Sequence, residues 1–441
     1  MERNRMPKKP TLGEATRFWL KLGFISFGGP AGQIAIMHEY LVAKKKWISD
    51  SRFLHALNYC MVLPGPEAQQ LATYLGWLLH GTRGGLIAGL LFILPSLLIL
   101  LGLSIVYVTF GKIPWVESIF EGLKPAVIAI VVVALIKIGK KSLLSYFHYG
   151  VALIAFALIF FLNIPFPLII LGAVILSFVF QKVGWIPKAG SGKSKTMDEE
   201  LEKSYFINEF SPRKKSGNPW KTIPQQLAVG IVLWIIPILL FLAISDNFQF
   251  WKTISLFFTQ AALVTFGGAY AVLPYVAQVS VEKYHWLDSF QMLDGLALGE
   301  TTPGPLIMVL VFVGFMAGYN SFEHSILMGT LGLLTTTYFT FLPCFLFVLA
   351  GAPWIELTRE NKQLKSLLAI VTAAVVGVVL NLTIYLGKGV FFPTELAGKP
   401  NYLAIAWTVV SFFALYRFKI NMLAWIGVSA IFGMVTYLIS N

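Results

Sequence analysis

The sequence predicts an all-α polytopic membrane protein made of two repeats of inverted topology, with about 13 transmembrane segments that include broken or re-entrant helices. Three observations support this fold class: the composition, a duplicated pair of motifs and the distribution of Lys and Arg. Hydrophobic residues make up 57% of the chain and charged residues only 12%. Ordinary soluble domains carry roughly 25% charged residues, so the composition indicates a membrane protein.

Apolar segments long enough to cross a membrane recur along the chain. Residues 86–110 are 25 residues without a charge, more than the roughly 20 that a helix needs to cross the bilayer core. A second uncharged run, 151–180, is interrupted at 163–167 and predicts two shorter spans joined by a turn. Further spans are expected near 225–244, 325–350, 366–387, 401–416 and 421–440. These segments are too long and continuous for barrel strands, and a backbone in lipid must satisfy its own hydrogen bonds, so we expect helices.

Two short motifs occur twice at an offset of 239 residues. The first copy contains Phe27-Gly28-Gly29, Trp47 and Pro64-Gly65-Pro66, and the second contains Phe266-Gly267-Gly268, Trp286 and Pro303-Gly304-Pro305. The two 40-residue stretches align without a gap, and eleven positions are identical. We therefore predict a first repeat at 1–182, a polar cytoplasmic linker at 183–224, a connecting span at 225–245 and a second repeat at 246–441.

The positive charges predict the orientation. If the N-terminus lies inside and the motif regions are re-entrant, 28 of the 34 Lys and Arg residues lie on the inner side and 6 on the outer side. If residues 18–38 and 53–79 are full spans instead, the division becomes 24 against 10. Cytoplasmic loops of membrane proteins are enriched in Lys and Arg. Both versions give a second repeat that starts outside, so the repeats are inverted, with a cytoplasmic N-terminus and an extracytoplasmic C-terminus.

The net charge of +13 is explained by this inner-side enrichment, so we expect no nucleic-acid partner. No apolar segment precedes residue 18, so no cleavable signal is expected, and the protein is predicted to lie in the cell (inner) membrane. The two cysteines, Cys60 and Cys344, lie in or beside apolar segments and do not suggest a disulfide framework. We expect the lipid bilayer as a partner of such a chain. The sequence leaves open whether the protein forms a homodimer.

The duplicated glycines and prolines predict a binding site. Glycine costs about 1 kcal/mol and proline about 3 kcal/mol relative to alanine inside a helix, so the motifs should break helices. Broken helices leave unpaired N–H groups and a partial positive charge at their N-terminal ends. Four breaks meeting at a pseudo-twofold axis would form an anion site lined by backbone. The alternative is that the motifs only kink helices or allow close packing; for four matched motifs we favour the site.

Polar side chains flank these breaks. Gln69 and Gln70 follow the first Pro-Gly-Pro, and Thr301 and Thr302 precede the second. Ser26 and Thr265 occupy equivalent places before the Gly-Gly pairs. These groups suit a polar ligand, although Ser and Thr often hydrogen-bond to their own helix instead.

Each Pro-Gly-Pro has one glutamate, on opposite flanks: Glu67 follows the first and Glu300 lies before the second. A carboxylate at membrane depth is a functional candidate that can carry a proton. The alternative is a fixed ion pair with Arg52 or Arg83. Five other acids are expected at the membrane interface: Glu39, Asp50, Glu282, Asp288 and Asp294. The histidines and acids lack metal-ligand spacing, so no metal and no cofactor are expected.

At these motifs the chain resembles the chromate ion transporter family in its long, two-domain form. The resemblance rests on Phe27-Gly-Gly-Pro-Ala-Gly-Gln-Ile-Ala, on Leu63-Pro-Gly-Pro-Glu-Ala-Gln-Gln-Leu and, in the second half, on Glu300-Thr-Thr-Pro-Gly-Pro-Leu-Ile. It covers about 15–110 and 255–385. It implies export of chromate from the cytoplasm, driven by the membrane potential or a proton gradient, and hence chromate resistance. It also implies sulfate as a competitor, because chromate is a tetrahedral dianion close to sulfate in shape.

Three alternatives remain at this point. The first is a transporter of sulfate or another oxyanion that carries chromate incidentally. The second is a membrane-embedded enzyme acting on lipid phosphates, which the sequence disfavours because no nucleophile–base pair or metal-ligand cluster recurs near the breaks. The third is a purely structural membrane protein, which leaves the helix breakers unexplained. We expect a transporter and no catalytic residues.

Overall fold

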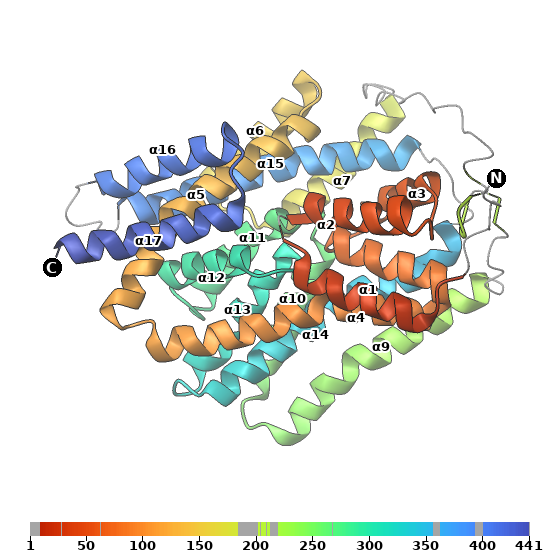
Figure 1. Ribbon diagram of the computed structural model, residues 1–441, viewed down its shortest axis with the longest axis horizontal. Helices are drawn as coiled ribbons and strands as arrows, with labels where there is room; N and C mark the ends of the chain where they lie inside the picture. Colours follow the sequence, from red (N-terminus) through yellow and green to blue (C-terminus); the bar gives the residue numbers. More distant parts are fainter. Residues whose placement is uncertain are drawn as a thin grey trace, which may run out of the picture.

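The computed structural model describes residues 9–27, 29–61, 63–183, 202, 204–208, 210–211, 219–266, 268–355, 362–392 and 400–440. Within these ranges the chain is helical, apart from turns and one isolated parallel bridge between Ile48 and Ile207. Figure 1 shows an elongated bundle with the two termini at opposite ends. The predicted all-α polytopic class is confirmed.

The helices of the first half precede a long helix, α9. They are α1 (Leu12–Ile25), α2 (Gly29–His38), the π-helix η1 (Glu39–Lys44), α3 (Asp50–Cys60), α4 (Glu67–Phe110), α5 (Pro114–Ser142), α6 (Tyr146–Leu162) and α7 (Phe166–Val183), followed by α9 (Pro219–Ile244). The helices of the second half are α10 (Phe248–Leu263), α11 (Ala269–Gln278), the π-helix η2 (Val279–Lys283), α12 (Ser289–Thr301), the 3₁₀ turn η3 (Leu306–Met308), α13 (Val309–Ser321), α14 (Ile326–Ile355), α15 (Lys362–Phe391), α16 (Tyr402–Tyr416) and α17 (Met422–Ser440).

Six helices of the described chain are long and apolar enough to cross a membrane: α4, α5, α9, α14, α15 and α17. The helices α6, α7 and α16 and the segment 306–321 are apolar but shorter. The expected turn at 163–167 is confirmed, because α6 ends at Asn163, which has a left-handed backbone, and α7 begins at Phe166. By contrast, six of the helices beside the duplicated motifs have only 10 to 16 residues: α1, α2, α3, α10, α11 and α12. At 1.5 Å per residue they reach about 15–24 Å, less than the bilayer core.

Local signals that fix the helix ends recur in both halves. Ser49 and Asp288 lie 239 residues apart, and each accepts a bond from the backbone N–H three residues later, at the start of α3 and of α12. Lys46 and His285 have the same offset, and both have a positive φ, of 52° and 50°. Polar N-cap side chains satisfy one of the unpaired N–H groups at a helix start. The backbone thus follows the same path into α3 and into α12.

Helix α4 is bent rather than continuous. His80 and Gly81 have non-helical backbone angles inside it, and Gly81 has φ 70° and ψ −159°. Only glycine adopts such a conformation without strain. The bend separates the segment after the first Pro-Gly-Pro from the long apolar segment that sequence analysis predicted at 86–110.

Long helices pack through small residues at close crossings. Helix α5 lies against α16 and α17, and α15 lies against α5, α6 and α7. A Cβ at Gly122 of α5 would meet the backbone of Gly433 in α17, and one at Gly377 of α15 would meet the backbone of Ala152 in α6. Small residues let helix backbones approach closely in membranes, where packing rather than hydrophobicity holds helices together. Figure 1 shows α16 and α17 beside α5, at the end of the molecule that carries the C-terminus.

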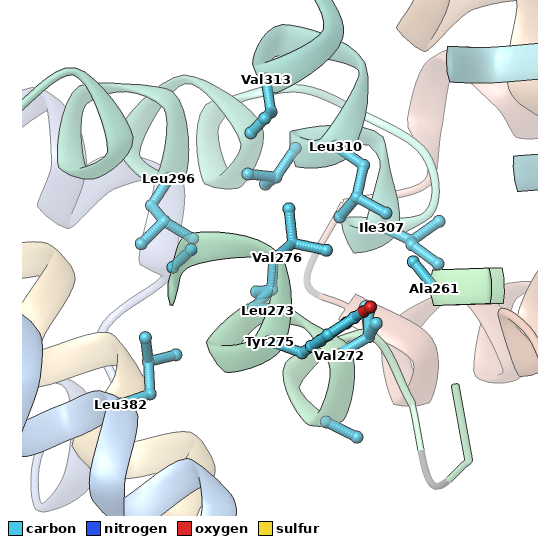
Figure 2. Close-up of a cluster of buried hydrophobic side chains, with 14 of the residues drawn as sticks. Ala261, Val272, Leu273, Tyr275, Val276, Leu296, Ile307, Leu310, Val313 and Leu382 are labelled. Atoms are coloured by element: carbon cyan, nitrogen blue, oxygen red, sulfur yellow. The ribbon is translucent and has the colours of Figure 1, made fainter. Parts of the chain in front are cut away.

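The second half supplies the larger part of the core. Helix α11 is buried from Ala271 to Ala277, and every residue from Leu306 to Ala317 is buried. Figure 2 shows Leu273 and Val276 of α11 among side chains of α12, η3 and α13, with Leu382 of α15 nearby. The equivalent helix of the first half, α2, buries only Gln33 and Met37. The two halves are therefore enclosed to different degrees.

The connecting helix and the linker differ from expectation in detail. Helix α9 begins at Pro219, six residues before the predicted span, and packs on α10 and α14 while exposing apolar side chains such as Leu239 and Leu240. Most of the linker at 183–224 lies outside the described residues. Its described segment at 204–208 is not simply solvated, because Ile207 is buried and exchanges backbone hydrogen bonds with Trp47 and Ser49.

Candidate functional site

The duplicated motifs interrupt helices at four places, as their composition predicts. The breaks lie between α1 and α2, α3 and α4, α10 and α11, and α12 and η3. Each contains a glycine with a positive φ: Gly29 at 72°, Gly65 at 126°, Gly268 at 101° and Gly304 at 102°. Residues with a side chain rarely adopt these angles, so glycine is required for the chain to turn here. Gly28 and Gly267 lie outside the described residues.

Two hydrogen bonds join the breaks of one half to those of the other. The amide of Gly65 donates to the carbonyl of Thr265 over 2.7 Å, and the amide of Gly304 donates to the carbonyl of Ser26 over 2.8 Å. The two donors, Gly65 and Gly304, are 239 residues apart, and so are the two acceptors, Ser26 and Thr265. The second bond is therefore the repeat equivalent of the first. Each Pro-Gly-Pro therefore lies against the residue that precedes the Phe-Gly-Gly of the opposite half. The breaks are thus paired across the two halves, each Pro-Gly-Pro with the Phe-Gly-Gly of the other repeat.

Buried amide side chains support this pairing. Gln33 Nε2 donates to the carbonyl of Gly304 at 2.5 Å and to that of Ser26 at 3.2 Å, so one side chain from α2 holds both partners of a cross-half bond. Ser96 of α4 donates to the carbonyl of Pro303. Gln70 Nε2 donates to the carbonyl of Pro64 at 2.7 Å. Sequence analysis missed Gln33 and Ser96. The sequence signal for Gln33 is an amide in an apolar run, at a position where the second repeat has Val272. The structure buries this side chain fully.

The helices that leave the breaks begin without a side-chain cap. The N-cap residues Pro66, Gly268 and Pro305 carry no side-chain acceptor for the first turns of α4, α11 and η3–α13. First-turn N–H groups have no partner within the helix, and the helix dipole places partial positive charge there. Such an end is suited to an anion. The amides of Gly65 and Gly304, however, are engaged with the carbonyls of the other half.

The polar side chains that flank the breaks bond within the protein. The hydroxyls of Thr301 and Thr302 both donate to the carbonyl of Leu298. Those of Ser26 and Thr265 donate to carbonyls one turn earlier in α1 and α10. A hydroxyl has one hydrogen to donate, so these four follow the alternative of bonding to their own helix.

Gln69 and Gln70 each have a side-chain amide oxygen without a hydrogen-bond partner in the described part of the chain. Gln69 Nε2 donates to Thr73 Oγ1 at 3.1 Å, and Gln70 bonds to Pro64. The Oε1 atoms of both have no hydrogen-bond partner in the described part of the chain, and both side chains are fully buried. Buried polar atoms normally have a hydrogen-bond partner. Two amide oxygens without one, beside the breaks, are typical of a place where a ligand or water binds.

The two glutamates differ in their surroundings. Glu300, near the end of α12, is 6% exposed and accepts a hydrogen bond from the Tyr270 hydroxyl at 2.7 Å. Glu67 begins α4 and is half-buried. Arg83 is exposed on α4 just past the bend, and Arg52 is buried in α3. The partner of Glu300 is thus a tyrosine hydroxyl, a group that neither candidate ion pair included.

Asp294, which is expected at the membrane interface, is enclosed by the helices around it. It is 5% exposed, and its carboxylate accepts a hydrogen bond from Tyr107 and lies 3.8 Å from Lys124 Nζ. No local pattern predicts this cluster, because Tyr107 and Lys124 lie on the consecutive helices α4 and α5 whereas Asp294 lies 187 residues after Tyr107.

These features together define a polytopic α-helical membrane protein whose broken helices are paired across its two halves, beside helix ends without side-chain caps and beside buried amides. The chain belongs to the chromate transporter family, whose model matches residues 13–178 and 252–434. The second matched segment starts 239 residues after the first, at the offset of the duplicated motifs.

Curated relatives cover most of the chain. It is 29% identical over 394 residues to a probable chromate transport protein of Synechococcus elongatus, covering 88% of each. It is 29% identical over 392 residues to the chromate transport protein of Cupriavidus metallidurans, covering 88% of this chain and 86% of the relative. It is 31% identical over 374 residues to that of Pseudomonas aeruginosa, covering 84% and 80%. No solved structure matches significantly.

Proposed function

We propose that this protein is a secondary transporter that exports chromate from the cytoplasm across the inner membrane and so confers chromate resistance. The relatives named as chromate transport proteins support the substrate. The observation that carries the site is the pair of cross-half bonds, from Gly65 to Thr265 and from Gly304 to Ser26. These bonds pair the helix breaks across the two halves, and in the proposed site a tetrahedral dianion finds several backbone N–H donors there.

The two halves act as inverted repeats about this site, with about 13 segments in total and short helix pairs that enter and leave the membrane on one side. Two observations favour this arrangement: the backbone angles repeat at the 239-residue offset, and the helices beside the breaks are shorter than the bilayer core. Separation of the halves would release the amides of Gly65 and Gly304 from their carbonyl partners. An oxyanion takes the place of those carbonyls, and the halves rock around it.

The candidate binding set contains three kinds of group. Backbone comes from Gly28, Gly29, Gly267 and Gly268 and from the two Pro-Gly-Pro turns; amides come from Gln69 and Gln70; hydroxyls come from Thr301 and Thr302 once their helix bonds are released. Glu67 and Glu300 are the proposed proton carriers, because a carboxylate at membrane depth can take up a proton and release it again. The membrane potential assists export by about 2.3 kcal/mol per charge per 100 mV, and so by roughly twice that for a dianion.

Transport into everted membrane vesicles tests the proposal. In these vesicles the cytoplasmic face is outward, so export is measured as accumulation of labelled chromate, with sulfate as competitor. We expect accumulation when the lumen is positive or acidic, and competition by sulfate. Vesicles with the protein that accumulate no more chromate than vesicles without it would refute export. Accumulation of sulfate in preference to chromate would identify the oxyanion alternative, and accumulation unaffected by an ionophore that exchanges K⁺ for H⁺ would remove the proton role of the glutamates.

A further inference from the structure

A cluster of charged side chains is buried away from the helix breaks, where α12 crosses α4 and α5. Lys124 Nζ lies 2.5 Å from Glu121 Oε1 and 3.8 Å from Asp294 Oδ1. The other carboxylate oxygen of Asp294 accepts a hydrogen bond from the Tyr107 hydroxyl at 2.9 Å. Lys124 also lies over the ring of Phe290, 4.8 Å from its centre. The side chains of Lys124 and Asp294 are only 7% and 8% exposed.

The charges of this cluster do not balance. One ammonium group faces two carboxylates and lies nearer to the exposed Glu121 than to the buried Asp294, so the fully ionised cluster has one excess negative charge and a buried carboxylate that is incompletely compensated. Burying an uncompensated charge is costly, and a buried carboxylate is usually paired or takes up a proton. One bound proton makes the cluster neutral. Its composition therefore suits the reversible binding of a single proton.

The cluster has a route to water. The Glu121 side chain is 57% exposed, whereas Lys124 and Asp294 are buried behind it. A cavity of about 40 Å³ lies beside them and is lined by Glu121, Lys124, Phe290 and Asn401, among others. A cavity of this size with polar walls holds a water molecule. In the proposed topology this end of α5 is the outer one, so protons would enter from the outside.

The cluster also joins the two halves and leads to the breaks. Lys124 and Tyr107 belong to the first half and Asp294 to the second, so the ion pair fastens α12 to α5. Asp294 lies six residues before Glu300 on α12, about 9 Å along the axis, and α12 then runs into Pro303-Gly304-Pro305. The repeat equivalent of Asp294 is His55, so the sequence does not duplicate the pair.

Four groups of the described chain act electrostatically on Asp294: Tyr107 on α4, Glu121 and Lys124 on α5, and Asp288 at the start of α12. The helices packed on α12 also carry Glu117 on α5, Tyr319 on α13, Tyr385 and Lys388 on α15 and Tyr437 on α17. Tyr385 is engaged with Ser289, and Lys388 has a partner of its own. Lys124 is the cation in direct contact with Asp294.

We propose that Asp294, Lys124 and Glu121 form a proton-binding site that takes up one proton from the outside and thereby loosens the attachment of α12 to α5. Uptake neutralises the excess charge and weakens the Lys124–Asp294 attraction that holds the halves together at this end. Helix α12, which carries Asp294, is then free to move relative to α5, together with the Pro-Gly-Pro break that follows it. This inference rests on the proposed export of chromate and adds, to the glutamates beside the breaks, a site outside the anion site at which the coupling proton enters.

The test compares two driving forces in the same everted vesicles. One is an acidic lumen at zero potential, and the other is a lumen-positive potassium diffusion potential at equal pH. The readout is the ratio of the two accumulations in each variant. If one proton is exchanged for each chromate, a pH difference of about one unit supports about a tenfold accumulation of chromate. We expect the wild-type protein to show it.

Asp294→Asn and Glu121→Gln each remove the excess carboxylate, so we expect both to lose accumulation driven by the acidic lumen. Asp294→Glu keeps the charge count and should retain it. Glu117→Gln is the matched control, because Glu117 lies one turn from Glu121 on α5 and is exposed. Since Glu121 is largely exposed, its substitution is not expected to prevent folding.

The proposal would be overturned if either Asp294→Asn or Glu121→Gln still accumulated chromate in response to the acidic lumen as the wild-type protein does. Inactivity of both variants under both forces, at normal amounts in the membrane, would also contradict it, because the potential should still drive a protein that has lost only its coupling proton. Failure of the wild-type protein under both forces would instead refute export itself, and accumulation driven by potential alone would refute proton coupling at any site.

Discussion

Gly65 and Gly304 combine a positive φ with an amide that donates to the opposite half of the chain. Their surroundings leave no room for a side chain. A Cβ at Gly304 would meet the Ser96 hydroxyl, and a Cβ at Gly65 would meet Gln70 Nε2 and Cys344 Sγ. The same two residues are therefore required by conformation, by packing and by hydrogen bonding. This explains why the duplicated motif keeps a glycine between its prolines.

Gly304→Ala should abolish chromate accumulation and destabilise the protein by about 1–3 kcal/mol, because alanine is strained at this φ. The measurements are vesicle uptake and thermal unfolding of the purified protein in detergent. Gly172→Ala in α7 is the control, since a Cβ there meets nothing within 4 Å. Normal uptake by Gly304→Ala would contradict the proposed backbone site.

Short helices and bends distinguish the elements near the site from the rest of the bundle. The helices α2 and α11 have 10 residues each and pass directly into π-helical turns. Such turns often occur at functional positions. In α4, the bend at Gly81 divides the helix into a part that starts at the Pro-Gly-Pro break and a part that crosses the membrane.

The bend in α4 can be tested with two glycines of the same helix. Gly81 has a positive φ and Gly102 is helical, and a Cβ at either position meets nothing within 4 Å. We expect Gly81→Ala to destabilise the protein by about 1–3 kcal/mol through backbone strain alone. Gly102→Ala should be neutral or stabilising by up to about 1 kcal/mol, since alanine is the better helix former. Equal melting temperatures in detergent for the two variants would show that the bend is not fixed by Gly81.

At the scale of the whole molecule, the two halves are interlocked rather than side by side. Helix α4 packs on α14, α15 packs among α5, α6 and α7, and each Pro-Gly-Pro bonds to the other half. Neither half contains both partners of these bonds. Inverted orientation is the topological prediction that follows from the distribution of Lys and Arg.

Cysteine labelling tests that orientation. The native Cys60 and Cys344 are fully buried and should not react with an impermeant maleimide. We expect Lys112→Cys and Asp246→Cys to react in intact cells, and Tyr146→Cys and Lys419→Cys to react only after the membrane is opened; all four positions are exposed. Reaction of all four from the same side would refute the proposed topology.

The amino-acid sequence alone was sufficient for the class, the family and the position of the breaks. Apolar length predicts membrane helices because lipid offers the backbone no hydrogen bonds, and Gly-Gly and Pro-Gly-Pro interrupt helices for local steric reasons. These properties depend on neighbours in the chain. The predicted spans at 151–180, with their turn at 163–167, and at 401–416 and 421–440 therefore agree with the observed helices to within about five residues.

The tertiary structure alone decided which groups face one another. Thr265 accepts from Gly65, Gln33 reaches Gly304, Tyr270 binds Glu300, and Asp294 is buried against Lys124. Each pair joins segments that no local pattern relates, because hydrogen bonds and ion pairs depend on how helices cross. For the same reason, the sequence predicted that the threonines and glutamines lie beside the breaks, but it did not predict which of their donors are already engaged.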